Sequence, residues 1–478
     1  MTRNKILFYS ASLIFIAVNI AFIAHDIYYV AFLPVILLFL LATVLSLDKV
    51  LLAVAFFTPL SIRLDYIIPE IPVNLYLPTE PLLIVTLFLF VSKLLLDGNL
   101  DKKMLKHPVS IAIYINLFWI FLTSITSTMP GVSFKFLLSR LWFIVAMYFL
   151  ATQLFKDYRN IEKFHWLYIA GLIVVIFYTN IRLSGYGLDN QNASNWVVWP
   201  FFSDHTSYGA MLVMFIFPLF YFMIRKNNGL FFQVITIIAF LIMSGGIILS
   251  YTRAAWVSFL AALALLIVIK LRIKVRYVLI MGVTMILILF ALQNTILEAL
   301  EKNESESSGK LSEHIESIAN ITSDASNTER INRWKSAVRM FREKPFWGWG
   351  PGTYKFQYAP FQFSYDRTVI STNFGDLGNA HSEYLSALSE SGVIGLISFI
   401  LIVFFAFRTG YRVYHRSSSK EVKKLTLYII LGLTTYFIHG FLNNFLDTDK
   451  ASIPVWGFIA MLVALDVYHK ENIPELPE

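Results

Sequence analysis

Apolar runs of about 20 residues recur along almost the whole chain, and they restrict its fold more than any other feature. A helix of this length crosses a bilayer, where every backbone polar group must be bonded internally. We expect about fourteen such spans, of which the third is short enough to be re-entrant. They lie near residues 6–24, 27–47, 50–62, 81–96, 108–126, 132–155, 164–181, 205–224, 230–250, 254–270, 277–295, 392–407, 425–444 and 453–468. The sequence therefore predicts an all-α polytopic integral membrane protein with about 12–14 transmembrane helices.

The composition points to the same fold class. Of the 478 residues, 57% are hydrophobic and only 15% are charged, whereas soluble domains carry about 25% charged residues. This balance excludes a soluble enzyme, a disordered chain and a collagen-like fibre. The chain has no cysteine, which excludes disulfides, thiol chemistry and cysteine-ligated zinc. The net charge of +8 predicts cytoplasmic loops rich in lysine and arginine rather than nucleic-acid binding.

Lysine and arginine gather most densely in two loops, near residues 270–276 and 408–424. Positive residues favour the cytoplasmic side, and an alternating path through fourteen spans brings both loops to that side. Both termini are then cytoplasmic. We expect three parts: a transmembrane bundle at 1–295, a large extracytoplasmic loop at 296–391, and carboxy-terminal transmembrane helices with a cytoplasmic tail at 392–478.

The loop at 296–391 is too long for a simple connector, which makes it a candidate functional domain. Within it, Ser326 to Glu329 form a capping-box pattern, apolar residues recur at helical spacing, and Pro345 ends the run. The pattern predicts an amphipathic helix in a mainly helical loop. Its apolar side would hold Ile331, Trp334, Val338 and Phe341, and its polar side Arg330, Arg333, Lys335, Arg339 and Arg342.

Three polar residues are candidates for a functional site. Arg140 lies inside a span, so it either pairs with a carboxylate or carbonyls between helices or contacts a ligand. Arg253 lies in a tight outer hairpin, where it is either an interfacial anchor or a ligand for a diphosphate, which suits its planar, permanently charged fork. His381 is either structural or a general base, since an ordinary histidine pKa is near 6.5.

Further polar residues fall on the predicted outer side: Arg182, Asp204, His205, His439 and Asp447. The histidines follow no zinc-binding spacing, so we predict no metal site. The sequence also has no glycine-rich phosphate loop with lysine, so nucleotide hydrolysis is not indicated. We therefore expect no cofactor, and any sugar donor must already be activated.

Three motifs stand in order between about residues 250 and 396. The first is Ser250-Tyr251-Thr252-Arg253-Ala254-Ala255-Trp256, and the second joins Arg330-Ile331-Asn332-Arg333-Trp334 to residues 345–352. The third runs from Asn379-Ala380-His381-Ser382-Glu383-Tyr384-Leu385 to Leu396. Together they resemble the O-antigen ligase and polymerase superfamily of bacterial envelope enzymes. Thr252, Ala254 and Ser382 depart from the family pattern, which commonly has Ser, Gly and Asn there.

The resemblance implies an integral-membrane glycosyltransferase of the bacterial inner membrane. Such an enzyme transfers a glycan from undecaprenyl diphosphate to an acceptor hydroxyl on the extracytoplasmic face, without a metal. Carried over residue by residue, Arg253 binds the diphosphate, with Arg140 and Arg182 as further candidates, and His381 activates the hydroxyl. The cleft and its support would include Arg330, Arg333, Trp334, Asn379, Glu383, His205 and His439.

The acceptor distinguishes members of this superfamily. It is lipid A core for an O-antigen ligase, the growing glycan for a polymerase, and a protein hydroxyl for a protein O-oligosaccharyltransferase. The layout from Arg330 to His381 resembles that of a ligase. A flippase for lipid-linked oligosaccharides would have the same composition, but transporters usually show repeated halves and polar groups near the midplane. The expected partners are the undecaprenyl-diphosphate-linked glycan, an acceptor that is lipid A core, glycan or glycoprotein, and membrane lipids, but not nucleic acid.

Overall fold

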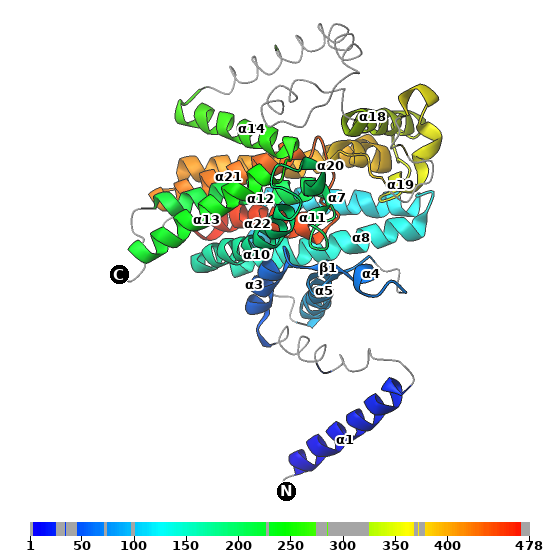
Figure 1. Ribbon diagram of the computed structural model, residues 1–478, viewed down its shortest axis with the longest axis vertical. Coiled ribbons are helices and arrows are strands. Elements are labelled where there is room, and N and C mark those ends of the chain that lie inside the picture. The colour runs from blue at the N-terminus through cyan, green and yellow to red at the C-terminus, as the bar shows by residue number, and fades with distance from the viewer. Residues whose placement is uncertain are drawn as a thin grey trace.

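The protein is a bundle of helices in its computed structural model (Figure 1). The structure describes residues 3–24, 34, 45–70, 74–96, 101–225, 229–273, 284, 325–367, 371 and 378–469. The expected spans at 27–47 and 277–295 and most of the segment 298–329 lie outside these residues. Within the described ranges, nine helices are long and apolar enough to cross a membrane. The prediction of an all-α polytopic membrane protein is confirmed.

Eight of the nine membrane-length helices are α5 (Thr79–Leu96), α7 (Pro108–Ile125), α10 (Tyr158–Ser184), α12 (His205–Ile224), α13 (Leu230–Leu249), α14 (Arg253–Lys270), α20 (Glu383–Arg416) and α22 (Asp449–Tyr468). The ninth is a continuous rod made of α8 (Pro130–Ile144), the π-helical turn η2 (Val145–Leu150) and α9 (Ala151–Leu154). Three other expected spans correspond to α1 (Arg3–Ile23), the short α3 (Leu47–Phe57) and α21 (Lys420–His439).

The remaining elements are short or lie outside the expected spans. They are β1 (Ile62–Arg63), α4 (Leu64–Ile67), β2 (Tyr76–Leu77), α6 (Lys102–Leu105), α11 (Gln191–Val197), α18 (Ala325–Glu343), α19 (Tyr354–Gln357), η3 (Ala359–Phe361) and η4 (Ser364–Asp366). The two strands pair antiparallel, with Ile62 opposite Leu77.

The core of the bundle lies around α12 and α22, which occupy its middle in Figure 1. Both helices are apolar on all sides and are buried almost throughout, as expected of central helices. Close contact is possible where a small residue faces a neighbour: a Cβ at Gly432 of α21 would stand 2.7 Å from the carbonyl oxygen of Met214 in α12. By contrast, most apolar residues of α13 and α14 are exposed or only partly buried, which is typical of helices that face lipid.

The residues of the three motifs meet at one end of the bundle, which we call the motif end. Here Thr252, before α14, bonds to His205 at the start of α12, and the N–H of Glu383 at the start of α20 donates to the carbonyl of Gly440 after α21 at 2.8 Å. Ion pairs such as Arg225–Glu162 join helices at the opposite end. The membrane face on which the motif end lies remains a prediction from the lysine and arginine distribution.

The second and third motifs are joined through a kink in α20. Gly392 has a positive φ of 69° inside this helix, so α20 bends at this residue. The expected span at 392–407 placed the start of the helix there instead. The groups released at the kink bond to the segment after α18: the N–H of Val393 donates to the carbonyl of Pro345 at 3.0 Å, and the N–H of Gly350 donates to that of Glu390 at 2.8 Å. A Cβ at Gly392 would stand 2.0 Å from the carbonyl oxygen of Phe346.

The predicted amphipathic helix exists as α18, but the residues that it buries most deeply are not those of the predicted apolar side. Glu329, Asn332, Arg333 and Ser336 are buried, whereas Trp334 and the other expected apolar positions are only partly buried. These four polar residues can be buried because they take part in hydrogen bonds or ion pairs. Asn332, for example, donates to Gln362 Oε1 at 2.7 Å, and Arg333 pairs with Glu329 at 2.6 Å.

The kink leads to a first prediction, the effect of Gly392→Ala. Gly392 has φ 69° and ψ −172°, a conformation nearly exclusive to glycine that costs other residues about 1–3 kcal/mol, and here an alanine Cβ would also meet Phe346. We expect Gly392→Ala to lower the thermal unfolding midpoint of the purified protein. Gly245→Ala in α13 is the matched control, because a Cβ there meets nothing within 4 Å. Equal midpoints for the two variants would contradict the proposed constraint.

Candidate active site

The first motif forms a tight turn between α13 and α14. Tyr251 has a positive φ of 48° in this turn, and Thr252 Oγ1 donates a hydrogen bond of 2.8 Å to the carbonyl of His205. The turn lies so close to α12 that a Cβ at Gly209 would stand 2.7 Å from Thr252 Oγ1. Arg253 is the first residue of α14, and the backbone N–H groups of a first helical turn favour an anion. The motif thus combines a guanidinium with a helix N-terminus.

The third motif holds His381 by its backbone. His381 has a positive φ of 46°, which is uncommon for a residue other than glycine and is maintained only when the surroundings impose it. Its N–H donates to Asn379 Oδ1 at 2.9 Å, and its carbonyl accepts from the indole N–H of Trp334 at 3.1 Å. Asn379 Nδ2 in turn donates to the carbonyl of Asn444 at 3.1 Å. Two neighbouring elements therefore fix the conformation of this segment.

Helix α18 shapes the chain just before His381. Arg333, on its buried face, donates through Nε to Glu329 Oε1 at 2.6 Å, and its guanidinium carbon lies 4.2 Å from the ring centre of Tyr358. The guanidinium packs against Gly378, where a Cβ would stand 1.4 Å from Arg333 Nη1. Only glycine fits at that position, so α18 packs closely against the segment just before His381.

The charges around His381 favour its neutral form. Burial lowers the pKa of His381 most, and the positive charges of Arg330 and Arg333 lower it further, to about 4. Asp204 and Glu329 oppose this effect only in part. His381 is therefore an uncharged imidazole at pH 7, and an uncharged imidazole can accept a proton.

Two other predicted residues, His205 and His439, lie at the same end. His205 begins α12 directly after its N-cap, Asp204. His439 ends α21 and is buried, with its Nε2 3.0 Å from Asn443 Nδ2. Asp204 and Arg330 interact electrostatically with both His381 and His439. The fold therefore brings residues of all three motifs into one polar region.

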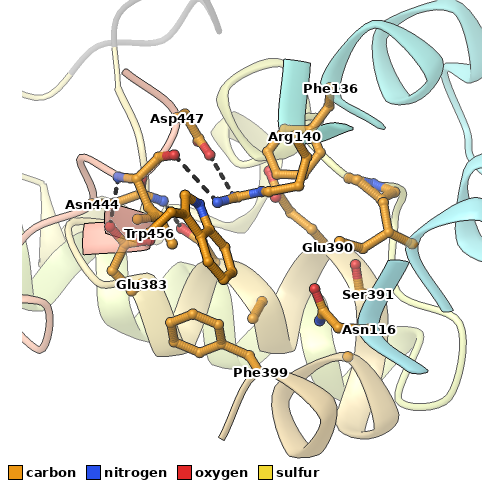
Figure 2. Close-up of a pocket in the computed structure, with 16 residues that line it drawn as sticks. Asn116, Phe136, Arg140, Glu383, Glu390, Ser391, Phe399, Asn444, Asp447 and Trp456 are labelled. Atoms are coloured by element: carbon orange, nitrogen blue, oxygen red, sulfur yellow. Dashed lines mark hydrogen bonds and ion pairs between the residues drawn. The ribbon is translucent and has the colours of Figure 1, made fainter. Parts of the chain in front are cut away.

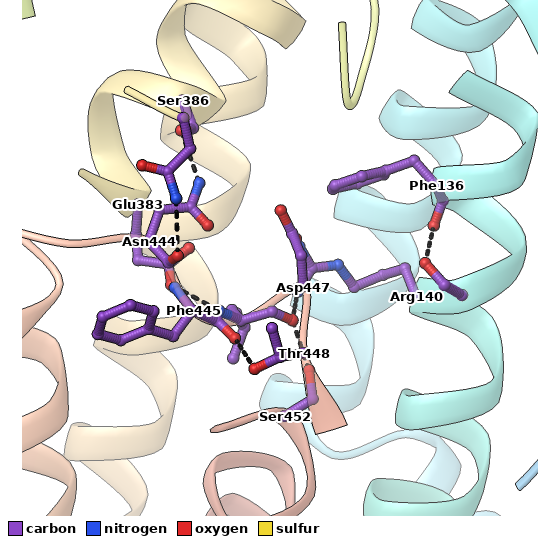
Figure 3. A network of polar contacts seen from close by, with 12 residues as sticks. Phe136, Arg140, Glu383, Ser386, Asn444, Phe445, Asp447, Thr448 and Ser452 are labelled. Atoms are coloured by element: carbon purple, nitrogen blue, oxygen red, sulfur yellow. Dashed lines mark hydrogen bonds and ion pairs between the residues drawn. The ribbon is translucent and has the colours of Figure 1, made fainter. Parts of the chain in front are cut away.

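Glu383 joins the start of α20 to the segment between α21 and α22 (Figure 3). Its Oε1 accepts three hydrogen bonds: from the Tyr436 hydroxyl at 2.7 Å, from the N–H of Phe445 at 2.8 Å, and from the N–H of Leu446 at 2.8 Å. A carboxylate oxygen with three donors is well stabilised in its position. Glu383 thus holds the α21–α22 segment against the segment that carries His381.

Arg140 and Arg182 contact two different segments. Arg140 donates to the Leu446 carbonyl at 3.2 Å and to Asp447 Oδ1 at 2.9 Å (Figure 2), which is the pairing between helices that the sequence left open. Arg182 donates to the carbonyl of Val197 at 3.1 Å. These contacts engage the α21–α22 and α11–α12 segments respectively, and neither includes Arg253.

Sequence reasoning missed a second buried polar cluster at the motif end. Asp449 accepts hydrogen bonds from Ser61 at 2.5 Å and Thr79 at 2.6 Å, and Lys450 donates to the carbonyls of Thr58 at 2.6 Å and Ser61 at 2.8 Å. These bonds tie the β1–β2 region to α22. An adjacent acid and lysine directly before an apolar run was the available signal.

Within the residues that the structure describes, no three histidine, aspartate or glutamate side chains gather closely enough to hold a metal ion. Independence from metal stays a prediction.

The fold and this polar region define a polytopic α-helical membrane protein with a histidine and arginine site at one end of its bundle. The model of the O-Antigen ligase family matches residues 238–400, which contain all three motifs. This match confirms the resemblance to the O-antigen ligase and polymerase superfamily, whose members are glycosyltransferase-type enzymes. A search of curated proteins finds no match.

The lowered pKa of His381 leads to a second prediction, on stability against pH. An unfolded histidine titrates near 6.5 and the folded one near 4, so the unfolded state binds more protons as the pH falls below 6.5. We expect the wild type to lose about 1–2 kcal/mol more stability than His381→Gln between pH 7 and pH 5. Thermal or chemical unfolding at each pH measures the difference. His415→Gln, at an exposed residue near the end of α20, is the control and should behave as wild type, and a parallel decline in all three proteins would contradict the assignment.

Proposed function

We propose that this protein transfers a glycan from undecaprenyl diphosphate to an acceptor hydroxyl, on the extracytoplasmic face of a bacterial inner membrane, as an O-antigen ligase with lipid A core as acceptor. The observation that carries this proposal is the uncharged, backbone-held His381 in one polar region with Arg330 and the α14 start that bears Arg253. Residues 296–391 would form the extracytoplasmic domain that completes the site. The charge distribution supports cytoplasmic termini.

In the proposed reaction, His381 removes the proton of the acceptor hydroxyl as its oxygen attacks the anomeric carbon. The new glycosidic bond forms while the bond between the anomeric carbon and the diphosphate breaks, and the diphosphate leaves with the electron pair. Arg253 and the first-turn N–H groups of α14 stabilise the negative charge of the leaving group. The donor is already activated, so the protein supplies orientation, charge and one base. Direct displacement would invert the anomeric centre.

The other predicted residues take supporting roles in this proposal. Trp334 and Asn379 hold the backbone of His381, and Arg333 and Glu383 hold the segments on either side. Arg330 adds to the effect of burial in lowering the pKa of His381. His205 and His439 would line the cleft. Arg140 and Arg182 were predicted as diphosphate ligands, but their described contacts favour structural roles. Arg140 holds the α21–α22 segment, and Arg182 holds the end of α11.

The third prediction concerns His381→Ala. Loss of a general base typically costs about 10²–10⁴-fold in rate, so we expect glycan transfer to fall by this amount while donor binding persists. Purified full-length protein with a lipid-linked glycan and lipid A core provides the assay. His415→Ala should retain full activity. Near-normal transfer by His381→Ala would refute the assigned base.

The fourth prediction concerns Arg253→Lys, which keeps the charge but loses the planar fork. Losing one charge-assisted, bidentate hydrogen-bonded contact typically costs about 1.5–3 kcal/mol. We therefore expect the KM for the lipid-linked donor to rise about 10- to 100-fold. The KM for the acceptor should be unchanged. Arg342→Lys, at an exposed residue of α18, is the matched control. A donor KM equal to that of the control would remove Arg253 from the diphosphate site.

Acceptor assays separate the ligase from its relatives. The motifs concern the donor and the catalytic step, so chain extension without lipid A core would identify a polymerase, and transfer to a protein hydroxyl would identify a protein O-oligosaccharyltransferase. A flippase would move lipid-linked glycan across a vesicle membrane without forming a glycosidic bond.

A further inference from the structure

A small cavity lies beside the His381 segment, between α7, α8, α20 and α22 (Figure 2). Its volume is about 50 Å³, and a cavity of about 10–15 Å³ already holds one water molecule. The cavity therefore has room for a few hydroxyl-sized groups. Its walls include Asn116, Phe136, Arg140, Glu383, Asn444 and Trp456.

The cavity does not suit an anion. Three carboxyl groups, those of Glu383, Glu390 and Asp447, line it together with one guanidinium, that of Arg140. Arg140 is already paired with Asp447 at 2.9 Å. A diphosphate here would meet no surplus of positive charge, and its desolvation would not be repaid.

A cation is also disfavoured. The Arg140 guanidinium would repel it, and all three carboxyl groups already have partners. Asp447 is paired with Arg140, Glu383 Oε1 accepts three hydrogen bonds, and Glu390 Oε1 accepts from the N–H of Tyr354 at 2.9 Å. The remaining class of ligand is polar and uncharged.

Several polar groups in the walls retain capacity for such a ligand. Trp456 is only 2% exposed, and its indole N–H has no hydrogen-bond partner among the described residues. Arg140 uses two of its N–H groups in described contacts, and a guanidinium has five. Asn116 donates through Nδ2 to Ser398 at 2.9 Å, which leaves its carbonyl oxygen as an acceptor.

The apolar part of the lining adds a second criterion. The rings of Phe136, Phe399 and Trp456 stand around the polar groups (Figure 2). Unused donors and acceptors among aromatic rings suit a sugar, which has hydroxyl groups on its edge and C–H groups on its faces. A buried N–H without a partner costs about 1–3 kcal/mol, and a sugar hydroxyl would supply the acceptor that Trp456 lacks.

We infer that this cavity is a subsite for an uncharged sugar residue, which enters by its hydroxyl edge. The inference rests on the proposed function, because that function supplies the glycans to which the sugar would belong. Glu383, in the cavity wall, is two residues from His381, and Asn444, in the same wall, accepts the hydrogen bond from Asn379. A sugar bound here would therefore lie beside the segment that carries His381, as part of either the donor glycan or the acceptor glycan.

The fifth prediction uses Trp456→Phe, which removes the indole N–H but keeps an aromatic ring. The loss of one hydrogen bond reduces affinity by about 2- to 10-fold. Binding is measured by calorimetry on the purified full chain with three probes: lipid-free donor glycan, lipid-free acceptor glycan and inorganic diphosphate. We expect weaker binding of one of the two glycans, which identifies the source of the sugar, and unchanged binding of diphosphate.

Trp142→Phe is the matched control, because Trp142 is also buried with an unpartnered indole N–H within the described residues but does not line the cavity. Asn116→Leu provides a second cavity variant should Trp456→Phe fail to fold. The inference is overturned if the cavity variants bind both glycans as the control does, or if diphosphate binding falls with them. Glycan binding needs no turnover, so a protein that binds through this cavity but transfers nothing would refute the proposed function alone.

Discussion

A break in a membrane helix releases backbone groups that lipid does not bond, so another part of the protein must bond them. In α20 this break is at Gly392, and the residues that bond to it are those of the glycine-rich segment after α18. Gly348, with a φ of 69°, allows the close approach, since a Cβ there would stand 2.3 Å from the backbone of Glu390. The join fixes α18 relative to α20, and the geometry of the motif end depends on it.

The conformation of His381 follows from this join. Once α18 is fixed, Trp334 reaches the carbonyl of His381, while Asn379 connects the same segment to the α21–α22 loop. All described hydrogen bonds of His381 are made by its backbone. A histidine held in this way keeps a fixed position while its ring stays available for a proton, so a left-handed residue costing about 1–3 kcal/mol is consistent with a functional position.

The sequence predicts the helices of this protein better than their contacts. The spans and α18 follow from local hydrophobic patterns, which depend on residues only a few positions apart. The burial of Asn332 and Arg333 in α18 was not predicted, because it depends on residues of other segments. Gln362 bonds to Asn332, and Tyr358 packs against Arg333. The same holds for Arg140, whose partner Asp447 is 307 residues away in the chain. Pairs at such distances leave no periodic signal, and the cavity they line leaves none either.

The two ends of a lipid-linked sugar make opposite demands on a protein, and the motif end contains a suitable region for each. A diphosphate needs positive charge, which the start of α14 and Arg330 would supply in the polar region around His381. A sugar needs directed hydrogen bonds rather than a surplus of positive charge, and the cavity offers donors and acceptors while Asp447 pairs with Arg140. Glu383 belongs to both regions, since it follows His381 by two residues and lines the cavity. In the proposed reaction the anomeric carbon connects the sugar to the diphosphate, so it would lie between these two regions.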